Sequence, residues 1–131
     1  MTMTGPENLT DIVPEYRSRN PVVRWLFWKR IEVAMDLAAM DGGTPLDVMD
    51  LGCGEGALLK RLSEERPSHR LRGMDSHPAA ASLRIPGAEV ARGDLTKPGC
   101  LPSAAFDRIF CLDVLEHIED DEGTLREIFR T

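Results

Sequence analysis

Short apolar runs alternate with helical segments after residue 45 of the chain. Strands are expected at the apolar runs over residues 46–51, 70–75, 88–92 and 106–112. Helices are expected over residues 56–66, 78–85 and 122–130. Strands that alternate with helices in this way form right-handed βαβ units around a parallel sheet. The strand interiors are apolar without strict alternation, as in sheets covered on both faces, so the pattern predicts an α/β doubly wound fold.

A longer helix is expected before this alternation, over residues 22–40. Asn20 and Pro21 form a typical helix start, because an N-cap residue is followed by proline at the first helical position. The apolar positions expected on one face of this helix are Val23, Leu26, Phe27, Ile31, Ala34, Leu37 and Ala38. We therefore expect residues 1–45 to form an N-terminal extension with a cap helix, and residues 46–131 to form the sheet domain.

The composition narrows the class of protein. A chain of 131 residues suits one compact domain, and 42% hydrophobic with 29% charged residues is typical of a globular protein. The net charge of −6 argues against a nucleic-acid partner. No apolar stretch has the length of a membrane span, and the N-terminus lacks the features of a secretory signal. The three cysteines show no C-x-x-C spacing, so we expect free thiols and a cytoplasmic location.

The first expected strand of the sheet domain runs into a turn with glycine at every second position, Gly52, Gly54 and Gly56. Glycine permits positive φ and lets a ligand approach the backbone, and the following helix start can bind an anion. Asp75 ends the second strand at about the spacing from this turn at which a carboxylate binds ribose hydroxyls. The same pattern fits a dinucleotide fingerprint, so a nicotinamide or flavin enzyme is an alternative.

Two further acids favour a cationic ligand over a dinucleotide. Asp50 stands immediately before the first glycine, where its charge would repel a pyrophosphate and attract an ammonium or sulfonium group. Asp94 follows the third strand and can accept a hydrogen bond from an adenine amino group. With Asp75, three carboxylates are expected around one cleft, which suits a cationic ligand that carries a ribose and an adenine.

Four segments in order, DLGCGEG, GMDSHP, ARGDL and FDRIFCLDVLEHIED, resemble the motif series of class I S-adenosylmethionine-dependent methyltransferases. The resemblance implies a Rossmann-like sheet of order 3-2-1-4, S-adenosyl-L-methionine as cofactor, and methyl transfer to an unidentified small-molecule or lipid acceptor. The cofactor-binding residues that it implies are Asp50, Leu51, Gly52, Cys53, Gly54, Gly56, Asp75, Ser76, Asp94, Leu95, Cys111, Leu112 and Asp113. It assigns no catalytic residue, since a general base is required only if the acceptor must lose a proton early.

A second, narrower resemblance concerns Asp113, Glu116 and His117. They are similar to the carboxylate and histidine cluster with which small-RNA 2′-O-methyltransferases hold a divalent metal. Those enzymes have Glu where Asp113 stands and use a later His. We interpret the segment as the ordinary helix start after the fourth strand, and expect no metal. Cys53 is interpreted as a small turn residue and not a nucleophile, and His69 and His77 as loop and turn residues.

The tryptophan-bearing helix has two interpretations. Trp25 and Trp28 lie outside the expected apolar face, among the basic residues Arg24, Lys29 and Arg30. The helix is either the N-terminal cap of the family, which covers the cofactor cleft and contributes to the acceptor pocket, or an amphipathic surface that makes weak contact with a membrane.

The complete family fold has seven strands, whereas the expected strands here number four. We therefore expect a shortened form or the N-terminal portion of a longer enzyme. The strand over 106–112 is expected to be an exposed edge, which favours self-association or pairing with another chain. A non-catalytic cofactor-binding module or partner subunit is the alternative function.

Overall fold

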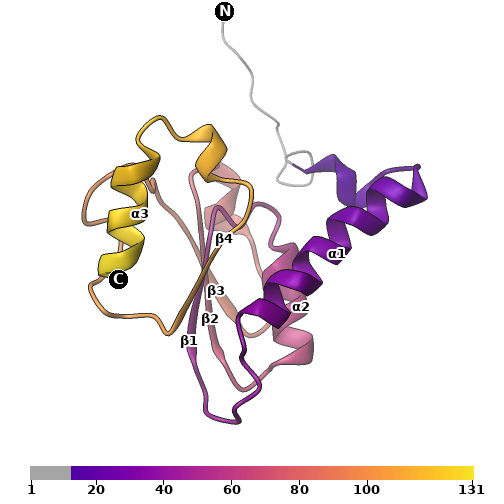
Figure 1. The fold of residues 1–131 in the computed structure, drawn as a ribbon, viewed down its shortest axis with the longest axis horizontal. Helices are drawn as coiled ribbons and strands as arrows, with labels where there is room; N and C mark the ends of the chain where they lie inside the picture. Colours follow the sequence, from indigo (N-terminus) through magenta and orange to yellow (C-terminus); the bar gives the residue numbers. More distant parts are fainter. Residues whose placement is uncertain (1–12) are drawn as a thin grey trace, which may run out of the picture.

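The computed structural model describes residues 13–131, and the first twelve residues of the expected N-terminal extension lie outside the described residues. The strands are β1 (Asp47–Leu51), β2 (Arg70–Asp75), β3 (Ala88–Arg92) and β4 (Arg108–Cys111). They form one parallel sheet in the order β3-β2-β1-β4 (Figure 1). The fold class and the predicted strand order are confirmed.

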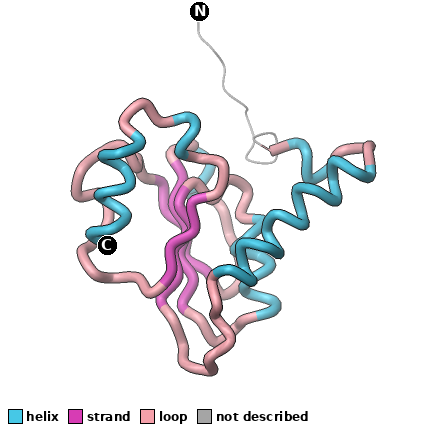
Figure 2. The backbone as a smooth tube through the Cα atoms, viewed as in Figure 1, coloured by secondary structure: helices cyan, strands magenta, loops and turns pink. Residues whose placement is uncertain are grey.

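Helices cover both faces of the sheet. They are α1 (Pro21–Leu37), α2 (Ala57–Glu65) and α3 (Asp121–Arg130), with short 3-10 helices η2 (Pro14–Arg17), η3 (Pro78–Ser82) and η4 (Leu115–His117). Figure 2 shows α1 and α2 on one side of the strands and α3 on the other. Successive side chains of a strand point to opposite faces of the sheet and so belong to two apolar clusters. One cluster contains Val48 and Phe110 beneath α1 and α2, and the other contains Met49 and Leu51 beneath α3. This is the doubly wound arrangement that the apolar runs predict.

Several element boundaries differ from the prediction. The segment expected as a helix over 78–85 is only a 3-10 turn over Pro78–Ser82. Ile85 precedes a proline, which disfavours helical backbone, and it bridges Ala88 at the start of β3. The strand expected over 106–112 is restricted to Arg108–Cys111. The N–H groups of Ala105 and Phe106 donate to the Thr131 carbonyl after α3 and not to β1.

The buried face of α1 differs in part from the expected apolar face. Asn20 caps the helix as predicted, because its Oδ1 accepts a hydrogen bond from the Val22 N–H at 3.0 Å. Ile31 is fully buried as expected, and Met35, which the sequence pattern missed, is buried beside it. The prediction is wrong at Leu26 and Leu37, because both side chains lie on the outer side of the helix and are mostly exposed. Apolar residues occur all around this helix, so the periodicity does not single out one face.

His69, expected as a loop residue, lies in the turn before β2 and is buried there. Its Nδ1 accepts a hydrogen bond from the Leu46 N–H at 3.1 Å, and its Nε2 lies 3.3 Å from the Met40 carbonyl oxygen. The ring thus joins the segment after α1 to the start of the sheet. We expect His69→Ala to lower the free energy of unfolding by about 1–3 kcal/mol, because it leaves a backbone N–H unpaired. Urea unfolding measures this, with the exposed His117→Ala as control; equal stability of both variants would contradict the role.

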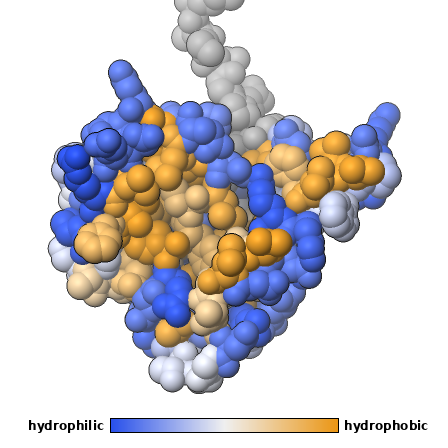
Figure 3. Space-filling model, viewed as in Figure 1, coloured by the Kyte–Doolittle hydropathy of each residue, from blue (hydrophilic) through white to orange (hydrophobic). Residues whose placement is uncertain are grey.

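The outer edge of β4 has no partner strand within residues 13–131. Figure 3 shows apolar side chains gathered over α3 and along α1 on the face of the molecule in view. Self-association through this edge stays a prediction, as does the domain boundary after residue 45. None of the helices described here is long and apolar enough to cross a membrane.

Candidate functional site

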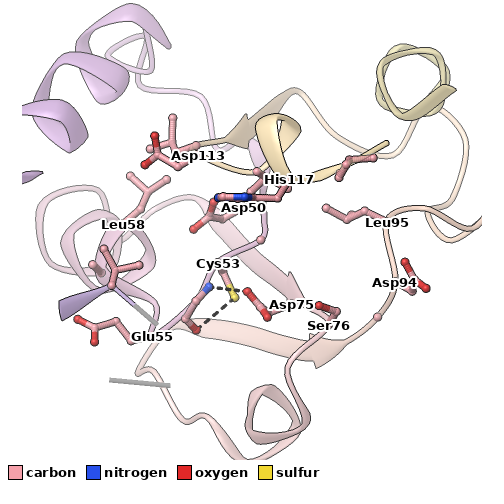
Figure 4. A pocket seen from close by; sticks show the side chains of 18 of the residues that line it. Asp50, Cys53, Glu55, Leu58, Asp75, Ser76, Asp94, Leu95, Asp113 and His117 are labelled. Atoms are coloured by element: carbon pink, nitrogen blue, oxygen red, sulfur yellow. Dashed lines mark hydrogen bonds between the residues drawn. The ribbon is translucent and has the colours of Figure 1, made fainter. Parts of the chain in front are cut away.

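A cleft of about 340 Å³ lies at the carboxyl ends of the parallel strands. Asp50, Asp75 and Asp94, which belong to or follow β1, β2 and β3, all line it (Figure 4). In an open α/β sheet this edge is where ligands bind, because loops diverge there on either side of the first strand. The predicted convergence of three carboxylates on one cleft is therefore present in the geometry.

The glycine turn after β1 forms the floor of the cleft. Gly52 and Gly54 have φ of +69° and +53°, in the left-handed region that favours glycine. A Cβ on Gly52 would lie 2.3 Å from Cγ2 of Val114, whereas a Cβ on Gly54 would meet no atom within 4 Å. The turn is held to β2, since the Gly52 N–H donates to the Met74 carbonyl at 2.7 Å and the Gly54 N–H to Asp75 Oδ2 at 2.8 Å. The space above Gly54 is thus open for a ligand.

The two glycines predict different responses to alanine. Gly54→Ala should cost roughly 1–2 kcal/mol of unfolding free energy, the strain of a left-handed alanine. Gly52→Ala should cost more, because its Cβ also collides with Val114. Adding Val114→Ala to Gly52→Ala should recover the excess in denaturant unfolding. Equal destabilisation by both single substitutions would show that the turn does not pack as described.

Asp50 is an unusual carboxyl because it is buried at the end of a central strand. Its exposed fraction is 3%, and none of the ion pairs within residues 13–131 involves it. Burial, and secondly the negative charge of Asp75, raises the pKa of Asp50 to about 8. The carboxyl therefore has no cation to balance its charge, which is the electrostatic setting of a site for a positively charged ligand.

The other two carboxylates are held in place by local hydrogen bonds. Asp75 accepts from the Gly54 N–H and, through Oδ1, from the His77 N–H at 2.8 Å, so it joins β2 to the glycine turn. Asp94 accepts from the hydroxyl and the backbone N–H of Thr96, and these bonds lower the pKa of Asp94. Asp94 is thus ionised at neutral pH.

The cysteines near the site are poor nucleophiles. Burial, with the nearby charges of Asp50 and Asp75, raises the pKa of Cys53 to about 12. Burial also raises the pKa of Cys111. A thiol with a raised pKa carries little thiolate at neutral pH. These values agree with the interpretation of Cys53 as a small turn residue.

Most of the residues that the resemblance implies line the cleft, and three do not. Those that line it are Asp50, Gly52, Cys53, Gly54, Asp75, Ser76, Asp94, Leu95, Leu112 and Asp113. Leu51 and Cys111 instead lie in or against the apolar cluster beneath α3, because alternate side chains of β1 and β4 point to that face. Gly56 caps α2 and packs against Ile85. Any ligand contact of these three would have to come through the backbone.

The N-terminal segment contributes residues to the cleft that sequence reasoning did not assign. Tyr16 and Arg30 line it. Arg30 forms an ion pair with Asp113, and its Nη2 lies 3.3 Å from the Tyr16 hydroxyl. Arg17 forms two hydrogen bonds to Glu55 in the glycine turn, at 2.7 and 3.1 Å. η2 and α1 are thus attached to the loops after β1 and β4, both of which line the cleft. The role of this segment as a cap stays a prediction.

The acids and histidine after β4 are not gathered as metal ligands. Among residues 13–131, no group of three or more His, Cys, Asp or Glu side chains could hold a metal ion. His117 lies 4.0 Å from Glu116 and lines the cleft, whereas Asp113 is paired with Arg30.

One known protein family matches the part of the chain that contains most of the sheet and of the site. The family described as "Methyltransferase domain" matches residues 49–131, which include most of β1, the other three strands and the glycine turn. The chain therefore belongs to this methyltransferase family.

Curated relatives of the chain are named as methyltransferases. The chain is 35% identical over 111 residues to a trans-aconitate 2-methyltransferase of Azoarcus sp., and 30% identical over 97 residues to one of Acidovorax sp.. These matches cover 78% and 72% of this chain but only 41% and 37% of the relatives. The chain thus spans about two fifths of the length of these relatives.

Solved structures share the fold. A structure from Methanococcus maripaludis covers 99% of this chain with a TM-score of 0.69 at 17% identity, and the chain covers 62% of it. The plantazolicin methyltransferase, solved with a desmethylPZN analogue and S-adenosylhomocysteine, covers 92% of this chain with a TM-score of 0.65 at 23% identity, and this chain covers 46% of it. The chain is short relative to these structures.

Proposed function

We propose that this chain binds S-adenosyl-L-methionine and forms the cofactor-binding part of a methyltransferase that acts on a small molecule. The observation that carries the proposal is the convergence of Asp50, Asp75 and Asp94 on one cleft above the glycine turn. Family membership and neighbours solved with S-adenosylhomocysteine support it.

The residues present fit this cofactor. Asp75 is fixed at the tip of β2, where its carboxylate can bind the ribose hydroxyls. Asp94 and Leu95 lie farther along the same edge, beside the space for an adenine. Asp50, buried without a cation, can balance the positive charges at the methionine end. The open space above Gly54 lets that end approach the backbone.

The bound cofactor supplies an activated methyl group on a positively charged sulfur. The protein then has to hold the acceptor in line with the methyl carbon and exclude water, and such orientation can supply about 7–11 kcal/mol of barrier reduction. Asp113, Leu112 and the cap residue Tyr16 line the cleft on the side of β4 and are placed to shape that space. We assign no catalytic base.

The acceptor is proposed to be a small molecule. Relatives at 30–35% identity are named for trans-aconitate, so a small carboxylic acid is the first acceptor class to test. Among the structural neighbours, coclaurine N-methyltransferase was solved with N-methylheliamine and the plantazolicin methyltransferase with a desmethylPZN analogue.

Calorimetric titration with S-adenosyl-L-methionine and with NAD tests the ligand class. We expect binding of S-adenosyl-L-methionine, and no binding of NAD, because the buried Asp50 carboxyl can ionise beside a cation but gives no attraction to a pyrophosphate. Binding of NAD alone would overturn the proposal. Transfer of labelled methyl groups to trans-aconitate and to a metabolite extract then tests the reaction, with the Asp75→Ala chain as the matched control.

A further inference from the structure

A basic stretch lies along the N-terminal half of α1 and the segment before it. Residues 17–30 contain five basic side chains and no acidic one, whereas the whole chain has 16 basic and 22 acidic residues. Two of the five, Arg17 and Arg30, pair with acids at the cleft. The other three, Arg19, Arg24 and Lys29, are exposed, and of these Lys29 pairs with Glu32 on the same helix at 2.8 Å. Positive charge is therefore concentrated on one projecting end of an acidic protein.

Exposed apolar side chains accompany these charges. Val22, Trp25 and Leu26 are 61%, 59% and 52% exposed, and their spacing places them on one side of α1. In Figure 1 this end of α1 extends away from the sheet, and Figure 3 shows apolar atoms at its surface. A contiguous apolar patch bordered by charge marks a surface that contacts a partner.

We propose that this surface, which we call the α1 tip (Arg19, Val22, Arg24, Trp25, Leu26 and Lys29), docks on an anionic lipid surface. The basic groups complement anionic headgroups, while the indole and the aliphatic side chains enter the boundary between headgroups and acyl chains. Tryptophan suits this boundary, because its ring is apolar and its N–H is polar. An RNA partner would use basic and aromatic groups, but the exposed aliphatic residues Val22 and Leu26 have no function in base stacking.

Docking through the α1 tip goes beyond cofactor binding and does not depend on it. The residues of the α1 tip do not line the cleft, whereas Arg30 on the same helix does. A protein that failed to bind S-adenosyl-L-methionine could still bind lipid, so the two proposals fail separately.

Vesicle binding tests the proposal with an internal reporter. The chain has two tryptophans, Trp25 and Trp28, and both lie on α1, so its tryptophan emission reports on this helix alone. We expect a blue shift and co-sedimentation with vesicles of phosphatidylcholine and phosphatidylglycerol, weakened by added salt. Equal binding to phosphatidylcholine alone, or no binding to either, would overturn the proposal. So would tighter binding to an RNA oligonucleotide than to the anionic vesicles.

Two double variants distinguish binding through the α1 tip from non-specific adsorption of exposed apolar residues. Trp25→Ser with Leu26→Ser should weaken partitioning into anionic vesicles by about tenfold or more, and Trp28 remains as the reporter. Leu125→Ser with Phe129→Ser removes two exposed apolar residues from α3, 49% and 94% exposed, and should leave partitioning unchanged. Equal losses in both variants would overturn the proposal. If circular dichroism shows that the first variant has lost its helix, the double variant Arg19→Gln with Arg24→Gln tests the proposal instead. It should also weaken binding to anionic vesicles, and unchanged binding would overturn the proposal.

Discussion

Asp75→Asn is expected to weaken S-adenosyl-L-methionine binding by roughly 10- to 100-fold, the effect of losing one or two charge-assisted hydrogen bonds. Asp75 is the acid that the spacing from the glycine turn assigns to the ribose, and its carboxylate is held at the tip of β2 by the Gly54 and His77 N–H groups. The amide keeps the size of the side chain and one acceptor oxygen but loses the charge. Isothermal titration calorimetry of the wild-type and variant chains measures the change.

The matched control is Glu89→Gln, which removes the same charge from β3 at a side chain that is 87% exposed. We expect this control to bind the cofactor like the wild type. Unchanged affinity in Asp75→Asn would mean that Asp75 is not the ribose acid. Equal weakening in both variants would mean that the effect comes from net charge and not from a contact.

Cofactor binding is expected to release close to one proton at pH 7, and the proton comes from Asp50. In the free protein burial and Asp75 raise the pKa of Asp50 to about 8, so the carboxyl is protonated at neutral pH. A cation bound beside it favours the ionised form and lowers that pKa. Calorimetry in buffers of different ionisation enthalpy measures the released proton, and affinity should rise with pH up to about 8. In Asp50→Asn the proton release should vanish.

The same carboxyl makes the stability of the free protein depend on pH. The folded-state pKa of about 8 lies above the ordinary value of 3.8, so the folded chain holds a proton that the unfolded chain loses. The contribution of Asp50 to stability is therefore complete below pH 4 and is lost as pH rises toward 8, by up to about 1.4 kcal/mol per pH unit. Asp50→Asn should be relatively more stable at pH 8 than at pH 5. An identical pH profile of unfolding in both chains would contradict the burial of an uncompensated carboxyl.

The sheet and its ligand edge could be predicted because they depend on local patterns. Apolar runs separated by helical segments define a parallel sheet. The carboxyl ends of its strands lie at one edge, independently of how the connecting segments pack. Asp50, Asp75 and Asp94 lie at or just after the carboxyl end of such a run, so their convergence follows from topology. The N-cap at Asn20 is also a local signal, and α1 begins directly after it.

Other features depend on contacts between distant segments. The pairing of Arg30 with Asp113 and of Arg17 with Glu55 joins residues far apart in sequence, and nothing in their local patterns indicates a partner. The predicted apolar face of α1 is wrong at Leu26 for a similar reason. This helix has apolar residues all around it, and only its packing against the sheet determines which of them are buried. The pKa of Asp50 likewise comes from burial, which the motif alone does not reveal.

A crystal structure with bound S-adenosylhomocysteine decides whether the three acids bind the cofactor. We expect the ribose hydroxyls on the Asp75 carboxylate, the adenine beside Asp94 and Leu95, and the amino group of the homocysteine end near Asp50 and the glycine turn. A ligand bound at another surface, or one whose ribose contacts none of these three acids, would contradict this expectation.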